Sequence, residues 1–296
     1  MKLFAPEYYK DFKCIADRCR HSCCIGWEID VDGDTMEKYR SLKGGYGKEI
    51  IESIDEDEIP HFRLVEKERC PHLDEKGLCK IITELGEGYL CHICREHPRF
   101  YNDTPYGKDV GLGMACEEVC RLILSSDGYN DISEVGEIEG DEEYFEFDPI
   151  MQRERIYSVL SDRSVPYTSR LERIADRYGV SPRDVPDAEW REIIGGLEYL
   201  DGKHREPFLG YSSGNKLVGP SEEKLERALA YFIYRHCSPA WDEEEFRASL
   251  GFSLFCERLL ASVSDGDADI PECARIISEE IEYSEENTER IKEIFI

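Results

Sequence analysis

Long hydrophobic runs and an excess of positive charge are both missing from this sequence. No stretch of about 18 apolar residues occurs, so we expect no integral membrane segment. The first residues, MKLFAPEYYKDFKC, mix charged and aromatic side chains and contain no apolar secretory segment, which predicts a cytoplasmic protein.

Basic residues are few: the chain has 37 basic and 65 acidic residues, a formal net charge of −28. Phosphate groups are bound by basic surfaces, so we expect no nucleic acid as a partner, and a cationic group such as a lysine side chain fits the charge better.

Cysteine is the residue that the chain has in excess. Thirteen cysteines occur, and ten of them lie at or before Cys120. A reducing compartment keeps thiols reduced, so metal ligation is a more natural interpretation than a disulfide framework. The other three, Cys237, Cys256 and Cys273, are isolated in predicted helices and are interpreted as core residues.

The N-terminal cysteines fall into three groups with the close spacing of metal-binding loops. The groups are Cys14, Cys19, Cys23 and Cys24, then Cys70, Cys79, Cys91 and Cys94, then Cys116 with Cys120. Thiolates that share a metal must converge on a centre with metal–sulfur bonds of about 2.3 Å, and short loops achieve this at the lowest entropic cost. The sequence therefore predicts a metal centre, or two of them.

The spacing leaves two kinds of metal open. The neighbouring side chains of Cys23 and Cys24 tend to diverge, which suits the separate corners of an iron–sulfur cluster better than a single tetrahedral ion. The four cysteines of the second group would also suffice for a structural zinc site. We expect an iron–sulfur cluster, with zinc as the alternative.

The cysteines and the helical periodicity are separated along the chain, so the predicted fold class is mainly α with two domains. Residues 1–124 have short apolar runs broken by glycine, proline and charge, which predicts a cysteine-rich metal-cluster domain of short helices and loops. Residues 125–149 are acidic and turn-rich, which predicts a linker. Residues 150–296 are predicted to form an all-α helical bundle.

One stretch of this bundle shows the helical period clearly. Apolar residues recur at 225, 228, 229, 232 and 233, and Ser221 is predicted to be the N-cap of their helix. Asp242 with Glu245 predicts a capping box at the start of the next helix. The polar residues of the first helix are interpreted as core and rim; they are Tyr231, Tyr234, Arg235 and His236.

Three segments resemble a known family. They are FKCIADRCRHSCCIGWEIDVD, RCPHLDEKGLCKIITELGEGYLCHICREHPRF and MACEEVCRLIL. Together they look like the flagellin lysine N-methylase (FliB-type) family, whose N-terminal part belongs to the wider CxxCxxCC (YkgJ-like) group of iron- or zinc-chelating regions. The later segment LAYFIYRHC is similar to a helical segment of the same family.

The resemblance implies transfer of a methyl group from S-adenosylmethionine to a lysine of a flagellin-like protein, supported by a [4Fe-4S] cluster. Carried over position by position, it also implies nine metal ligands. These are Cys14, Cys19, Cys23, Cys24, Cys70, Cys79, Cys91, Cys94 and Cys116. Cys120 stands where the family pattern has a small residue and His97 where it has an aromatic one, so both are interpreted as packing residues.

Three further residues are candidates for contact with a cofactor. Trp27 follows the double cysteine and would shield a cluster from solvent. Arg95 and Arg99 flank the last cysteine pair and would neutralise thiolates or bind a carboxylate of the methyl donor. The ordinary alternatives are a core aromatic and two surface ion-pair residues. No catalytic base is assigned among the 65 acids and 17 tyrosines.

Two other classes of function fit the same cysteines. One is a metal-binding module that stores or delivers iron or zinc or senses redox state, and the other is a different iron–sulfur redox or modification enzyme. The sequence has no C-x3-C-x2-C signature, because Gly26 takes the third place after Cys19 and Cys23. It also lacks a glycine-rich nucleotide-binding turn, so no motif for the methyl donor supports the methylase prediction.

Overall fold

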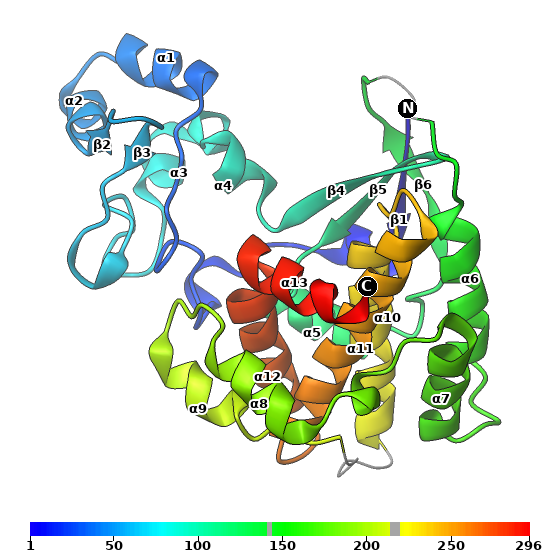
Figure 1. Ribbon diagram of the computed structural model, residues 1–296. Coiled ribbons are helices and arrows are strands. Elements are labelled where there is room, and N and C mark those ends of the chain that lie inside the picture. Colours follow the sequence, from blue (N-terminus) through cyan, green and yellow to red (C-terminus); the bar gives the residue numbers. More distant parts are fainter. Residues whose placement is uncertain (141–143, 214–219) are drawn as a thin grey trace. The chain divides into compact units, whose positions relative to one another are not determined.

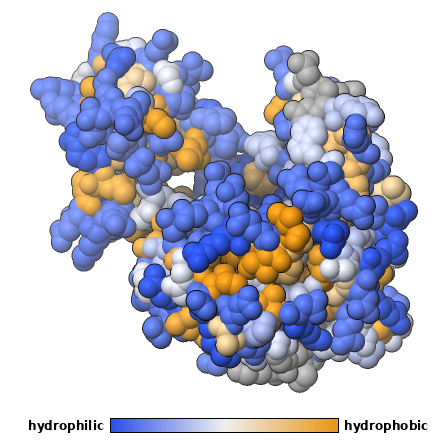
Figure 2. Space-filling model, viewed as in Figure 1, coloured by the Kyte–Doolittle hydropathy of each residue, from blue (hydrophilic) through white to orange (hydrophobic). Residues whose placement is uncertain are grey.

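The computed structural model describes residues 1–140, 144–213 and 220–296 (Figure 1). The chain divides into two compact units. We call Lys13–Arg99 the cysteine-rich unit, and Met1–Phe12 together with Phe100–Ile296 the main unit. Most side chains on the face drawn in Figure 2 are hydrophilic, in keeping with the high content of charged residues.

The cysteine-rich unit is made of short elements, as the sequence predicts. Its α-helices are α1 (Gly33–Ser41), α2 (Gly45–Glu52), α3 (Lys80–Leu85) and α4 (His92–Glu96), with 3₁₀ turns at Ala16–Arg18, Glu66–Glu68 and Glu87–Tyr89. Two short strands, β2 (Ile54–Asp55) and β3 (His61–Phe62), pair antiparallel. A small core lies among these elements, and its buried residues include Met36, Tyr39, Ile50 and Phe62 together with Cys70 and Cys91.

The main unit contains a four-stranded sheet in the order β4-β5-β1-β6. Its strands are β1 (Lys2–Pro6), β4 (Arg99–Thr104), β5 (Gly107–Leu112) and β6 (Ile132–Glu137). Strand β1 pairs parallel with β5 and antiparallel with β6. At the start of β5, Gly107 has φ +134°, and a Cβ atom there would meet the Lys2 carbonyl of β1, so this close strand contact requires glycine.

Helices make up the rest of the main unit (Figure 1). They are α5 (Glu117–Ser125), α6 (Pro149–Leu160), α7 (Tyr167–Tyr178), α8 (Asp187–Gly195), α9 (Arg205–Phe208), α10 (Pro220–Cys237), α11 (Glu243–Val263), α12 (Ile270–Ile277) and α13 (Glu285–Lys292). A π-helical turn, Ser278–Glu282, follows α12, and 3₁₀ turns occur at Glu7–Asp11, Pro182–Asp184, Gly202–His204 and Glu293–Phe295. Within the described residues, no helix is both long enough and apolar enough to cross a membrane.

The observed division of the chain differs from the predicted domains. Residues 1–12 and 100–124 belong to the main unit, and the predicted linker at 125–149 contains β6, which pairs with β1. A strand that pairs with residues more than a hundred positions away carries no local signal of its partner. The prediction of helices alone after residue 149 agrees with the described elements, and the chain is mainly α-helical.

Helices α10 and α11 pack at the centre of the main unit and confirm the helical period. The periodic residues Leu225, Ala228, Leu229, Phe232 and Ile233 are each fully buried. Asp242 caps α11 by accepting a hydrogen bond of 2.8 Å from the Glu245 amide, as predicted. The prediction for Ser221 was wrong, because α10 already begins at Pro220 and Ser221 lies in its first turn.

The polar residues of α10 act as core residues. Tyr231 and Tyr234 are buried, and the Tyr234 hydroxyl lies 3.0 Å from the Phe4 carbonyl and 3.1 Å from the Val110 carbonyl. These contacts join α10 to strands β1 and β5. Cys237 on the same helix and Cys256 on α11 are fully buried, and Cys273 on α12 is partly buried against the core, as predicted.

Candidate metal centre

A tight turn brings Cys70 and Cys79 to the same end of a loop. The Asp74 carboxylate accepts hydrogen bonds of 2.8 Å from the amides of Lys76 and Leu78, and Gly77 takes the left-handed conformation with φ +78°. Aspartate and glycine favour this geometry for different reasons, the first by bonding its own backbone and the second by lacking Cβ. The sequence DEKG therefore folds the loop back on itself, with Leu73 and Cys79 forming a β-bridge.

The double cysteine is placed beside this loop by backbone pairing. The Cys70 amide donates to the Cys24 carbonyl at 2.8 Å, and the Gly26 amide donates to the Glu68 carbonyl at 2.9 Å. The backbones of residues 24–26 and 68–70 thus run side by side. This pairing carries Cys24 of the first cysteine group to Cys70 of the second, across more than 40 residues.

Helix α1 holds the third segment, which carries Cys91 and Cys94. The Asp32 carboxylate caps α1 through the Thr35 amide at 3.0 Å and also accepts from the His92 amide at 2.7 Å, at the start of α4. The buried Tyr39 hydroxyl donates to the Tyr89 carbonyl at 2.7 Å and lies 3.6 Å from the Cys91 sulfur. One helix therefore anchors both ends of the segment Tyr89–His92.

Five thiols of the cysteine-rich unit are close enough to affect one another electrostatically. They are Cys24, Cys70, Cys79, Cys91 and Cys94. All five are buried or partly buried. The fold of this unit therefore brings Cys24 of the first cysteine group together with all four members of the second, and the Cys23 side chain contacts Cys24.

The pKa values within this thiol cluster differ in direction. A hydrogen bond from the Cys23 side chain, with smaller help from Ser22 and Arg69, lowers the pKa of Cys24 to about 7 against the effect of burial. A hydrogen bond from Cys94 lowers the pKa of Cys91, and the same contact with burial raises the pKa of Cys94. Burial raises the pKa of Cys70 to about 12. The lowered pKa values of Cys24 and Cys91 favour the thiolate, which is the form that binds metal.

The spacing of the thiols bears on the kind of metal. In the part of the chain that the structure describes, three potential ligand atoms within 4.8 Å of one another occur at His204, Glu279 and Glu280, and no three cysteines meet this limit. A tetrahedral zinc ion with bonds of about 2.3 Å needs sulfurs roughly 3.8 Å apart. Ligands of a polynuclear cluster bind different irons and need not approach so closely.

The remaining predicted ligands lie outside this group of five. Cys14 and Cys23 are exposed and Cys19 is partly exposed, all in the cysteine-rich unit. Cys116 belongs to the main unit, where it is the N-cap residue of α5. Cys120 is buried in the core of the main unit, with its sulfur 3.1 Å from the Pro271 carbonyl, which agrees with its interpretation as a packing residue.

The predicted cofactor contacts are spread over different elements. Arg95 on α4 is exposed, lies 3.3 Å from the His92 ring, and lines an open depression of ≈ 390 Å³ with Asp32 and Lys38. Arg99 begins β4, and Trp27 is partly buried after the double cysteine. His97 is partly buried, and burial lowers its pKa to about 4, which agrees with packing.

Sequence reasoning missed two residues of the thiol cluster's surroundings. Tyr39 contacts Cys91, and the buried His72 has its two ring nitrogens 3.3 Å from the Tyr46 hydroxyl and 3.0 Å from the Ser53 hydroxyl. The position of His72 two residues after a predicted ligand was a usable signal. Tyr39 gave none, since its helix lies more than 50 residues before Cys91.

Comparison with known proteins gives relatives at modest identity. No family model matches the chain, and no solved structure is significantly similar. The chain is 31% identical over 134 residues to the lysine-N-methylases of Salmonella choleraesuis and Salmonella typhimurium, a match to 40% of this chain and 32% of each relative. It is 28% identical over 165 residues to the flagellar biosynthetic protein FliU of Salmonella muenchen, a match to 52% of this chain and 94% of that protein.

These relatives support the predicted resemblance to lysine methylases. The chain spans about a third of the length of the two lysine-N-methylases it matches. The matched part of the chain is thus similar to proteins named for lysine methylation and for flagellar biosynthesis.

Proposed function

We propose that the protein is an S-adenosylmethionine-dependent lysine N-methyltransferase that acts on a flagellin-like protein in the cytoplasm and carries an iron–sulfur cluster in its cysteine-rich unit. The similarity to two lysine-N-methylases supports the reaction, and the FliU relative supports the link to flagella. The excess of 65 acidic over 37 basic residues favours a substrate with exposed lysines over a nucleic acid.

The five clustered thiols fit an iron–sulfur group. Cys24, Cys70, Cys79, Cys91 and Cys94 would supply the four thiolates that a [4Fe-4S] cluster takes. The adjacent Cys23 and Cys24, whose side chains tend to diverge, suit the separate corners of a cluster better than one ion. A bound cluster would supply electron transfer or an exposed iron site. The exposed Cys14 and Cys23, with Cys19, would serve a second centre, and zinc in place of iron is the alternative. Cys116, in the main unit, stays a predicted ligand.

Methyl transfer requires a neutral lysine amine, whose ordinary pKa is about 10.4. An acidic surface attracts the protonated form, and a desolvated acceptor must then take its proton before the amine attacks the methyl group. Arg95 is a candidate to bind the carboxylate of the methyl donor. It follows Cys94 in the sequence and lines an open depression. Trp27 and Arg99 stay predicted cofactor contacts, Trp27 as a shield of the cluster and Arg99 as a partner of thiolates or of the methyl donor.

The direct test is methyl transfer to lysine. Anaerobically purified protein is incubated with isotope-labelled S-adenosylmethionine and flagellin, and lysine modification is read by mass spectrometry. We expect label on lysine with the wild type, a loss of at least tenfold with Cys91→Ser, and little change with the control Cys273→Ala, which lies outside the thiol cluster. Absence of label from every lysine with metal-loaded wild type would reject the methylase proposal.

A metal-binding module without methylase activity is the second candidate. The short match to the lysine-N-methylases and the absence of a methyl-donor motif favour it. The same experiment separates the two, because a module would hold its metal at full stoichiometry and transfer no label.

A further inference from the structure

A second group of potential metal ligands lies in the main unit and contains no cysteine. His204 ends the 3₁₀ turn Gly202–His204, and Glu279 and Glu280 lie on the π-helical turn Ser278–Glu282. One ligand atom from each of the three residues lies within 4.8 Å of the other two. Glu280 is buried and the other two are partly exposed: the side chains of Glu280, His204 and Glu279 are 1%, 12% and 22% exposed.

The ligand atoms are already directed at one another. The Nδ1 atom of His204 lies 2.6 Å from Oε1 of Glu280. Two atoms bound to the same tetrahedral zinc at about 2.1 Å would stand roughly 3.4 Å apart, so a small opening of this contact would admit an ion. π-helical turns inside α-helical segments are frequent at functional sites.

The carboxylates also have the supporting contacts that metal ligands need. The amide of Leu200 donates to Oε2 of Glu280 at 2.7 Å, and the amide of Asp201 donates to Oε1 at 3.1 Å. Arg275 donates to Oε2 of Glu279 at 2.8 Å, which orients that carboxylate. Such outer contacts fix ligand orientation and strengthen metal binding.

We propose that His204, Glu279 and Glu280 bind one divalent first-row transition-metal ion, with Zn²⁺ as the best match. An imidazole nitrogen with two carboxylate oxygens is a mixed donor set that zinc accepts, and three protein ligands leave a position open for water or a further ligand. The ion would replace the direct hydrogen bond between His204 and Glu280. It would join the turn before α9 to the turn after α12.

The main unit offers a matched control for this site. His236 and Glu282 form a similar shielded contact, with Nε2 of His236 2.9 Å from Oε1 of Glu282. The second carboxylate that completes the first site is missing from this pair among the described residues. The two histidine–glutamate pairs thus differ in the feature that the proposal needs.

The test uses Co²⁺ as a spectroscopic probe, added to the full chain with its native metal in place. We expect one tightly bound Co²⁺ with visible d–d bands and no near-ultraviolet sulfur-to-cobalt charge transfer, as nitrogen and oxygen ligands require. His204→Ala and Glu279→Gln should each weaken this binding at least tenfold, while His236→Gln should leave it within twofold. Glu279→Gln serves where His204→Ala does not fold.

Two results would overturn the proposal. One is Co²⁺ uptake that carries only the thiolate signature, which would assign all binding to cysteines. The other is equal affinity for the wild type and Glu279→Gln, which would show that the second carboxylate plays no part.

Discussion

The hydroxyl of Tyr39 lies between a backbone carbonyl and a cysteine sulfur. It donates to the Tyr89 carbonyl at 2.7 Å and is 3.6 Å from the Cys91 sulfur, with the tyrosine 1% exposed. Removal of the hydroxyl would leave the carbonyl without its donor and loosen the segment that carries Cys91. A hydrogen bond to a cluster sulfur is also one of the factors that set a reduction potential.

Tyr39→Phe should therefore destabilise the cysteine-rich unit by about 1–3 kcal/mol, the cost of leaving a buried polar group unpaired. Tyr106→Phe is the control, because Tyr106 is 57% exposed and bonds Asp148 at the surface, and it should cost less than about 0.5 kcal/mol. Urea unfolding measures both. Equal stabilities for the two variants would contradict the role given to Tyr39.

The stability of the main unit should depend on pH through the buried His236. Burial lowers the pKa of His236 to about 4, although its hydrogen bond to Glu282 opposes the shift. In the unfolded chain a histidine takes up its proton near pH 6.5. The unfolded state therefore binds more protons below that pH, and stability is lost as the pH falls from about 6.5 to about 4.

Replacement of His236 by glutamine should remove this contribution, which amounts to as much as about 3 kcal/mol. Unfolding free energies of wild type and His236→Gln, measured by urea at several pH values between 7 and 4, should converge as the pH falls. Curves that stay parallel over this range would show that His236 does not titrate as described.

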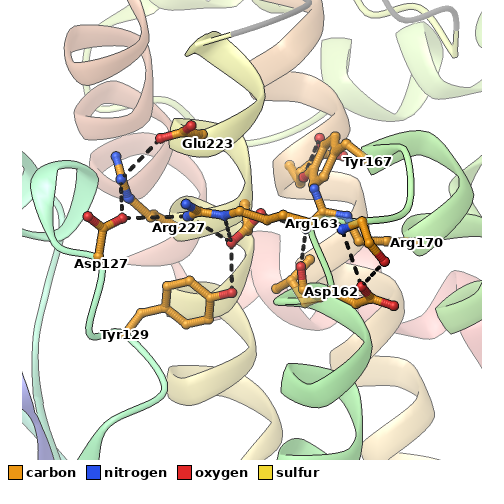
Figure 3. A network of polar contacts seen from close by, with 12 residues as sticks. Asp127, Tyr129, Asp162, Arg163, Tyr167, Arg170, Glu223 and Arg227 are labelled. Carbon is orange, nitrogen blue, oxygen red and sulfur yellow. Dashed lines mark hydrogen bonds and ion pairs between the residues drawn. The ribbon is translucent and has the colours of Figure 1, made fainter.

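At the scale of elements, a buried charge network joins α10 to its neighbours. The Glu226 carboxylate on α10 lies 2.6 Å from Arg170 on α7, 3.3 Å from Arg163 and 2.8 Å from the Tyr129 hydroxyl. Figure 3 shows Arg227 of the same helix directed at Asp127 and Glu223. Segments far apart in sequence thus meet at one side of α10.

Glu226→Gln should destabilise the main unit by about 3–5 kcal/mol, because the buried Arg170 guanidinium loses its counter-charge. Glu223→Gln removes a carboxylate of the same helix that is 51% exposed and 3.4 Å from Arg227, and it should cost less than about 1 kcal/mol. Thermal unfolding of the two variants gives the comparison. A similar loss of stability in both variants would show that burial of the Glu226–Arg170 ion pair does not set the cost.

The sequence predicted those helices and caps whose pattern lies within a few neighbouring residues. The period of α10 and the cap at Asp242 depend on residues within a turn or two, and the structure confirms both. The pairing of β1 with β6 depends on residues more than 120 positions apart, and β6 lies in an acidic stretch that is typical of a linker. The spacing of the cysteines along the chain predicted that they would cluster. The contact of Tyr39 with Cys91 depends on tertiary packing alone.

At the scale of the whole molecule, the two units should differ in their dependence on metal. The cysteine-rich unit has a small core that includes two of its own predicted ligands, Cys70 and Cys91, whereas the main unit has a large apolar core around α10 and α11. A small core gains less free energy from apolar burial, so metal ligation would contribute a larger share of the stability of this unit.

Removal of the metal by a chelator should therefore raise amide hydrogen exchange across residues 13–99 and leave α10 and α11 protected. Hydrogen exchange with mass spectrometry resolves the two units in one experiment. Equal exchange before and after chelation in residues 13–99 would contradict a structural role for the metal.

We propose above all that the thiol cluster binds an iron–sulfur group. Anaerobic purification followed by iron, zinc and acid-labile sulfide analysis, with electron paramagnetic resonance of the reduced protein, tests it most directly. We expect iron and sulfide in equal amounts, about four of each per cluster, and their loss in Cys91→Ser. Stoichiometric zinc without acid-labile sulfide would contradict it.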